Sequence, residues 1–244
     1  MFHDQNLRDT ISSSISVIVP TRNEGQTIVS LAERLHAALP RAEIWIIDGG
    51  YDDTRERLAE WQSRWPTLHY HRHVGDRGKG HAIRKGIELC TRPLIAQLDA
   101  DLQFDPEDLL AMAQAFVESR ADFVCGSRFL PTSSRQARST PGLRAFGNRA
   151  FSLYTSAITG QRFSDVLAGI KMWKREVTEA FSLTSDDYSY EVELPVKARR
   201  LGFRVIDFPV TTTERTHGKS SVNVVKTSVQ LLKNIPKFQW QKIS

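Results

Sequence analysis

Short apolar runs alternate with helically spaced apolar residues along the first half of the chain. The runs are rich in β-branched residues, as is typical of buried strands, and they cover residues 15–20, 44–47, 68–74 and 93–98. Between the runs, apolar residues recur every three or four positions, as on one face of a helix, for example at Ile28, Leu31 and Leu35. This alternation predicts a parallel sheet with helices on both faces.

The second half of the chain continues the alternation less regularly. The pattern predicts helices over 109–117, 143–158 and 192–201 and strands over 123–125 and 203–208. Residues 131–142 are rich in Ser, Thr, Pro and Arg, and we expect a mobile loop there that carries Arg135 and Arg138. No internal repeat or linker is visible, so the prediction is one α/β domain with a doubly wound, mostly parallel sheet.

The two ends of the chain differ from this domain in composition. Residues 1–14 are polar and Ser-rich, which predicts a disordered N-terminal segment. The domain itself is expected over residues 15–221. Residues 222–244 are predicted to form a basic amphipathic helix, with Val222, Val225, Val229 and Leu232 on one face.

Polar residues follow several of the predicted strands. Asn23 and Glu24 come after the first strand, Asp48 after the second, and Asp99 with Asp101 after the fourth. Doubly wound sheets bind ligands beyond the carboxyl ends of their strands. We therefore expect these side chains to converge in space.

The motif Asp99-Ala100-Asp101 suggests a metal site. In an extended chain residues two apart point the same way, so the carboxylates of Asp99 and Asp101 can reach one ion, and Gln103 can add a third oxygen. Such hard oxygen ligands suit a divalent cation such as Mg²⁺ that also binds substrate phosphates. An Asp-x-Asp at the end of a strand can equally cap a turn, and the motif alone leaves both readings open.

Composition narrows the class of protein. At 244 residues, 40% apolar and 25% charged, the chain is typical of a globular domain, and no apolar run is long enough to span a membrane. Cys90 and Cys125 lie among apolar neighbours, which favours buried reduced thiols and a cytoplasmic protein. After Glu214 there are six Lys or Arg and no acid. This basic end fits either peripheral contact with an anionic membrane or a solvated surface.

An ordered set of short motifs runs from about residue 15 to 221, which is most of the chain. The motifs are Val19-Pro20-Thr21-Arg22-Asn23-Glu24, Asp48-Gly49-Gly50, Gly78-Lys79-Gly80, Asp99-Ala100-Asp101-Leu102-Gln103, Gly126-Ser127-Arg128-Phe129, Asn148, Asp165, Gly169 and Arg215-x-x-Gly218-x-Ser220. Taken in order, they resemble those of the family 2 glycosyltransferases of GT-A fold, in particular the polyprenyl- or dolichyl-phosphate sugar synthases.

This resemblance implies a nucleotide-diphospho-sugar donor, either a GDP- or a UDP-hexose, and a role for each matching residue. The nucleotide sugar would contact Pro20, Arg22, Glu24, Asp48, Lys79, Asp99 and Ala100. Asp99, Asp101 and Gln103 would hold the Mg²⁺ or Mn²⁺. Asp101, Arg128, Arg215 and Lys219 would act in catalysis, with Arg128 lining the acceptor loop and Arg215 and Lys219 closing over phosphates.

Three departures from the family pattern stand out. Asp48-Gly49 replaces the usual Asp-Asp pair, and Tyr51 stands where Ser is common. The sequence therefore does not indicate which nucleobase the donor carries. Ser220-Ser221 replaces the usual Ser-Lys, with Lys219 one residue early. Many relatives also carry membrane helices after the catalytic domain, and this chain has no such run.

The expected reaction is inverting transfer of a hexose to a polyprenyl phosphate, whose anionic phosphate can attack without a base. Arg128, Arg135, Arg138 and Arg144 fit a phosphate acceptor. Transfer to a sugar hydroxyl is the alternative, and it would need a carboxylate base such as Asp165, Glu191 or Glu193. For at least one of the two glutamates, an exposed helix face is the simpler interpretation. A non-catalytic sugar-nucleotide-binding subunit of a membrane complex is a third possibility.

Two other features of the sequence do not support a further function. His69, His71 and His73 share one face of a predicted strand, but no Cys or further His motif accompanies them, so the sequence does not favour zinc. Basic residues do not alternate with exposed aromatics, which disfavours nucleic-acid binding.

Overall fold

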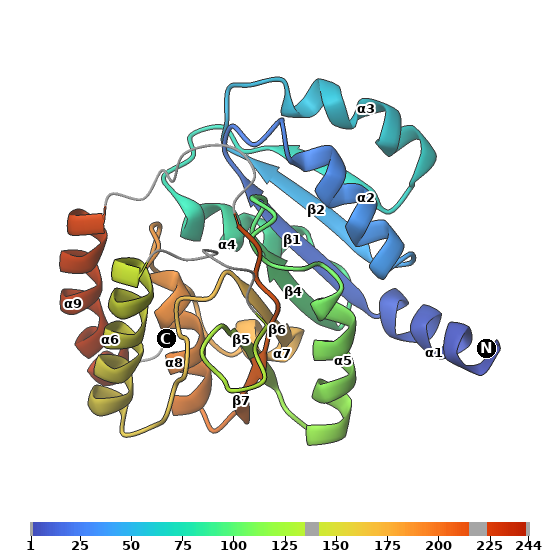
Figure 1. The fold of residues 1–244 in the computed structure, drawn as a ribbon. Coiled ribbons are helices and arrows are strands. Elements are labelled where there is room, and N and C mark those ends of the chain that lie inside the picture. Colours follow the sequence, from blue (N-terminus) through green and yellow to red (C-terminus); the bar gives the residue numbers. More distant parts are fainter. Residues whose placement is uncertain (1, 135–141, 215–223, 243–244) are drawn as a thin grey trace.

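A mixed sheet forms the centre of the computed structural model, which describes residues 2–134, 142–214 and 224–242 (Figure 1). Within these residues seven strands are ordered β3-β2-β1-β4-β6-β5-β7. Neighbouring strands are parallel except at β6, which is antiparallel to both β4 and β5. The strands are β1 (Ile15–Thr21), β2 (Glu43–Asp48), β3 (Leu68–Arg72), β4 (Leu94–Leu98), β5 (Phe123–Ser127), β6 (Ile170–Lys174) and β7 (Val205–Pro209).

Helices cover both faces of this sheet (Figure 1). They are α1 (Phe2–Ser13), α2 (Ile28–Ala38), α3 (Thr54–Arg64), α4 (Lys79–Leu89), α5 (Asp108–Ser119), α6 (Gly142–Thr159), α7 (Arg175–Glu179), α8 (Tyr190–Arg200) and α9 (Val224–Trp240). Apolar residues of α2, α3 and α5 belong to the core on one face, and those of α4, α7 and α8 to the core on the other. The doubly wound α/β fold predicted from the sequence is confirmed.

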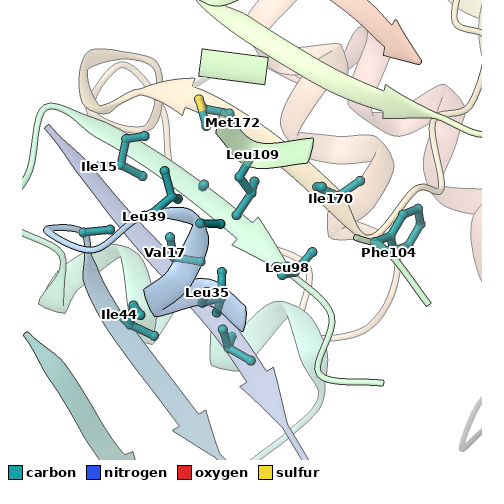
Figure 2. Close-up of a cluster of buried hydrophobic side chains, with 14 of the residues drawn as sticks. Ile15, Val17, Leu35, Leu39, Ile44, Leu98, Phe104, Leu109, Ile170 and Met172 are labelled. Atoms are coloured by element: carbon teal, nitrogen blue, oxygen red, sulfur yellow. The ribbon is translucent and has the colours of Figure 1, made fainter. Parts of the chain in front are cut away.

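Side-chain alternation along β1 explains the two cores. Val17 and Val19 lie in the first core, shown in Figure 2, whereas Ile18 between them lies in the second. Successive side chains of a strand point to opposite faces, and each fully buried aliphatic side chain stabilises the fold by roughly 2 kcal/mol. Cys90 and Cys125 are buried free thiols, as predicted.

A third apolar cluster joins α6, α8 and α9 at one side of the molecule. Val192 and Val196 of α8 pack with Leu231, Ile235 and Phe238 of α9. Figure 1 shows α6 and α9 side by side there, and the Tyr154 hydroxyl donates to the Leu232 carbonyl at 3.4 Å. The amphipathic helix predicted near the C-terminus thus packs on two other helices.

The structure differs from the expectation of a disordered N-terminal segment, because Phe2–Ser13 form helix α1. Arg8 Nε donates to the Ala38 carbonyl at 3.0 Å, Ile11 packs against the first core, and Ser12 is buried. Contacts with the end of α2 therefore stabilise a polar helix whose own sequence carries little apolar periodicity.

Strand β6 and the short helix α7 also escaped the sequence pattern. Lys171 and Lys174 interrupt the apolar run of β6, although Lys171 is completely buried. A buried charge is tolerated when it is paired, and Lys171 contacts the Glu191 carboxylate. The apolar pattern did not predict β6, because it cannot show that Lys171 is buried against Glu191 from another element.

Candidate functional site

The carboxyl ends of β1 and β2 meet at the mouth of the sheet. Asn23 Oδ1 accepts a hydrogen bond of 2.8 Å from the Tyr51 backbone N–H. A Cβ placed on Gly50 would lie 2.5 Å from the Asn23 backbone nitrogen, so the close approach requires glycine. Asn23 itself has a left-handed φ of 60°, a conformation that costs free energy outside glycine and is frequent at functional sites. The predicted convergence of these two strand ends is confirmed.

Asp48 lies beneath this mouth, and its carboxylate accepts hydrogen bonds from its neighbours. Its side chain is 1% exposed. One carboxylate oxygen accepts from the Gly50 N–H at 2.7 Å, and the other accepts from the Tyr70 hydroxyl at 2.7 Å and from Arg72 at 3.3 Å. Burial and the hydrogen bond to Asp48 raise the pKa of Tyr70 to about 12. At the surface, the same turn presents the 85%-exposed Tyr51, with the Arg72 guanidinium 5.2 Å from its ring centroid.

Asp99 and Asp101 follow β4, the neighbour of β1. Asp101 Oδ1 accepts from the Gln103 N–H at 3.1 Å, and Leu102 between them has a left-handed φ of 58°. Asp101 therefore does stabilise a turn, as the simpler interpretation of the motif expected. The Asp99 carboxylate instead packs against Gly169, where a Cβ would collide with it, and the Asp99 N–H donates to the Gly169 carbonyl at 3.2 Å.

A buried network of charges lies behind Asp99. Lys79 Nζ is 2.6 Å from Asp99 Oδ1 and 2.7 Å from Glu191 Oε1. The Lys171 ammonium contacts the other oxygen of Glu191, and Gln97 Nε2 donates to that oxygen at 3.1 Å. Two lysines thus hold one glutamate, and one of them also reaches the first carboxylate of the Asp-x-Asp motif.

The network sets the protonation of its members. Burial raises the pKa of Asp99 to about 6, with Asp101 and Glu191 adding to the rise and Lys79 opposing it. Burial alone would raise the pKa of Glu191, but Lys171 and Lys79 together lower it to about 2. Burial likewise opposes the charge on Lys79, but Asp99 and Glu191 raise its pKa well above the ordinary value. Glu191 is therefore ionised and Lys79 is cationic at neutral pH.

Arg128 is held by Asp165 in a two-pronged ion pair. Arg128 Nε lies 2.6 Å from Asp165 Oδ2, Nη2 lies 2.8 Å from Oδ1, and the Arg128 backbone N–H also donates to Oδ2 at 3.0 Å. Asp165 is completely buried, and the Arg128 guanidinium lies 5.7 Å from the Phe104 ring and 5.6 Å from the Phe129 ring. Burial opposes the charge, but Asp165 raises the pKa of Arg128.

Glu193 is buried as well as Glu191, so the interpretation of an exposed helix face is wrong for both. Lys197 Nζ lies 2.6 Å from Glu193, and the backbone N–H groups of Thr184 and Ser185 donate to it at 2.8 and 2.9 Å. These bonds lower its pKa against the effect of burial. Glu193 fixes the loop before α8.

The remaining predicted residues are spread around the mouth. The exposed side chain of Arg22 lies 3.9 Å from Asp76, Glu24 accepts from the Thr27 hydroxyl at 3.4 Å, and Ala100 is buried. Pro20 lies half-buried in β1. Arg215, Lys219, Arg135 and Arg138 lie outside the described residues.

Sequence reasoning missed the roles of Lys171 and Glu191 in one network. No local signal marks Lys171, because its partner comes from another element. The spacing of Glu193 and Lys197, four residues apart on the predicted helix, is a visible pattern that could have predicted their ion pair.

Comparison with known proteins agrees with this arrangement. The chain is 29% identical over 215 residues to a polyprenol monophosphomannose synthase of Mycolicibacterium smegmatis, covering 85% of this chain and 80% of that protein. It is 29% identical over 218 residues to an undecaprenyl-phosphate mannosyltransferase of Micrococcus luteus, covering 86% and 87%.

The fold is shared with a solved enzyme. Glucosyl-3-phosphoglycerate synthase from Mycobacterium tuberculosis, crystallised with Mn²⁺, UDP-glucose and phosphoglyceric acid, superposes with a TM-score of 0.71 at 19% identity, covering 95% of this chain and 82% of that one. The predicted GT-A fold is thereby confirmed. The family model described as glycosyl transferase family 2 matches residues 16–181. The chain therefore belongs to glycosyl transferase family 2.

Proposed function

We propose that the protein is a divalent-metal-dependent, inverting glycosyltransferase that moves a hexose from a nucleotide-diphospho-sugar to a polyprenyl phosphate. The relatives named above act on polyprenol or undecaprenyl phosphate, which supports this acceptor class. A hydroxyl acceptor would need a carboxylate as its base. The observation that carries the proposal is that the candidate carboxylates are buried and already form ion pairs.

Each of those carboxylates is already engaged. Asp165 is bound by Arg128, Glu191 by two lysines, and Glu193 by Lys197, and all three are buried. A general base must accept a proton in the transition state, and a carboxylate with a pKa of about 2 accepts one poorly. A lipid phosphate is anionic at neutral pH and needs no base. The buried ion pairs therefore favour a phosphate acceptor over a sugar hydroxyl.

The residues after β4 fit a divalent cation. Burial raises the pKa of Asp99 to about 6, and the nearby carboxylates of Asp101 and Glu191 add to the rise. A divalent cation bound here would offset the repulsion among these carboxylates. We propose that Asp99, Asp101 and Gln103 hold Mg²⁺ or Mn²⁺. When bound, the metal neutralises charge that develops on the leaving nucleoside diphosphate.

The chain's own cations have complementary roles in this proposal. Lys79 holds the Asp99 carboxylate in place at 2.6 Å. Arg128, fixed by Asp165, presents its guanidinium at the acceptor side, where bidentate donors suit a phosphate. Arg22, Glu24 and the turn after Asp48 bind the nucleoside, Pro20 and Ala100 line its pocket, and Arg215 and Lys219 close over the phosphates.

We further propose that α6 and α9 rest on the surface of the membrane that holds the lipid acceptor. No helix among the described residues has the length and apolar character needed to cross a bilayer. Phe146 and Leu153 of α6 and Val229, Leu232 and Trp240 of α9 are large exposed apolar side chains. On α9 they alternate with the exposed Lys226, Lys233 and Lys237. Apolar anchors among lysines suit an interface with anionic lipid.

One assay tests the acceptor class. The purified protein is incubated with GDP- and UDP-hexoses and Mn²⁺, and with polyprenyl phosphate, the corresponding polyprenol or a free oligosaccharide as acceptor. We expect an extractable glycosyl phosphate lipid with polyprenyl phosphate alone, and loss of this product in chelator. Transfer to the polyprenol or the oligosaccharide at a comparable rate would contradict the proposal.

A further inference from the structure

We propose that His73, Asp76 and His81 form a second metal site, separate from Asp99 and Asp101, that takes a transition metal such as Zn²⁺. His73 follows β3, Asp76 lies in the next loop, and His81 lies in the first turn of α4. One short segment supplies all three ligands, so little chain entropy is lost on binding. This site does not depend on the proposed transfer reaction.

The ligand atoms are already gathered. One ligand atom from each residue lies within 4.8 Å of the others, and His73 Nε2 is 2.9 Å from His81 Nδ1. Tetrahedral Zn²⁺ with Zn–N bonds of about 2.0–2.1 Å places two nitrogens about 3.3 Å apart. A metal therefore needs the rings to separate by only about 0.4 Å. It replaces the hydrogen bond between the rings and the 3.3 Å bond from the Arg77 N–H to His81.

Neighbouring groups hold the ligand side chains in place. His73 is buried, with 7% of the residue exposed. Asp76 is oriented by the Gly78 N–H, which donates to Oδ1 at 2.9 Å. Its other oxygen faces Arg22 at 3.9 Å, on a side chain that is 60% exposed.

The surroundings leave room for a metal and balance its charge. A cavity of about 510 Å³ borders His73 and His81 and can supply water as a fourth ligand. Basic residues also line it, but each has an acidic partner. Arg72 lies 3.3 Å from Asp48, Arg77 lies 3.1 Å from Asp186, Arg84 contacts the same Asp186 carboxylate, and Lys85 lies 2.9 Å from Glu88. Two histidines and a carboxylate are a ligand set that suits Zn²⁺ and Co²⁺ better than Mg²⁺.

The experiment uses Co²⁺ as a spectroscopic probe of the whole chain. The metal-free protein is titrated with Co²⁺ in an excess of Mg²⁺, which competes for the oxygen ligands of Asp99 and Asp101. We expect the visible absorption of tetrahedral Co²⁺ to appear with a stoichiometry of one per chain and to disappear on addition of Zn²⁺.

Variants locate the site. We expect His81→Asn and His73→Asn each to weaken Co²⁺ binding at least tenfold (~1.4 kcal/mol). His71 borders the same cavity but is not one of the three ligands, so His71→Asn should bind Co²⁺ as the unaltered protein does. Asp99→Asn should do the same. Since His73 is buried, His81→Asn decides the outcome if His73→Asn fails to fold. No Co²⁺ absorption in the unaltered protein, absorption that survives His81→Asn, or absorption lost in Asp99→Asn would overturn the proposal.

Discussion

Lys79 Nζ lies 2.6 Å from Asp99 Oδ1, so a lysine contacts the first carboxylate of the Asp-x-Asp motif. The same amine lies 2.7 Å from Glu191, which comes from α8. The motif after β4 is therefore tied electrostatically to helix α8, which packs against β5 and β7.

Asp99→Asn and Asp101→Asn should each lower turnover by at least about 100-fold, because each removes a charge from the proposed metal site. Turnover is measured with Mn²⁺ and saturating donor, and thermal melting checks that the fold is retained. Asp105→Asn is the matched control in the same loop, since Asp105 pairs with Arg34 at 2.8 Å. Full activity of either variant, or activity of the unaltered protein in chelator, would remove the metal assignment.

Glu191→Gln should lower the free energy of unfolding by about 3–5 kcal/mol, because it leaves Lys79 and Lys171 buried without their shared anion. Urea denaturation gives this value. Glu176→Gln is the control: its carboxylate is 58% exposed and lies 3.4 Å from Lys174, so we expect a change below about 0.5 kcal/mol. Equal stabilities of the two variants would show that the network contributes no net stability.

The stability difference between the unaltered protein and Glu191→Gln should depend on pH. The pKa of Glu191 is about 2 in the folded state, below its ordinary value of 4.5, so the unfolded chain binds the extra proton first. Its contribution, roughly 3 kcal/mol, is complete above pH 4.5 and is lost as pH falls toward 2. Denaturation series between pH 6 and 3 should show the gap narrowing; a constant gap would contradict this protonation state.

Arg128→Lys should raise the KM for the phosphate acceptor at least about tenfold and leave the KM for the donor unchanged, because lysine cannot form the two-pronged pair with Asp165. Steady-state kinetics with each substrate varied in turn separates the two. Arg34→Lys, which alters an ion pair with a partly exposed arginine, should change neither constant. A rise in the donor KM instead would place Arg128 on the nucleotide side.

Replacing Lys226, Lys233 and Lys237 with Glu should abolish co-sedimentation with anionic liposomes, since each lysine near such a surface contributes about 1 kcal/mol. The control reverses Arg55, Arg57 and Arg64 of α3, on the side of the molecule away from α9, with the same change in net charge (Figure 1). Binding that is unchanged by the first set, or lost equally with the second, would argue against a membrane surface on α9.

The sequence by itself determined much of the fold and brought the residues of the candidate site to one edge of the sheet. The strands β1, β2 and β4 and the polar residues after them follow from local apolar periodicity, and the rule for parallel sheets brings those residues to one edge. Asn23, Asp48 and Asp99 could be placed without coordinates for this reason. The resemblance to family 2 glycosyltransferases rested on the same residues.

Only the tertiary structure decided what surrounds the carboxylates. Lys79 and Glu191 are 112 positions apart, and Lys171 lies on β6, an antiparallel strand inserted between β4 and β5. Periodicity describes one element at a time, so it cannot show that a charged residue is buried against a partner from another. For the same reason residues 1–14 were predicted to be disordered and at least one of Glu191 and Glu193 was assigned to an exposed helix face. The contacts that hold α1 and bury the two glutamates come from other elements of the chain.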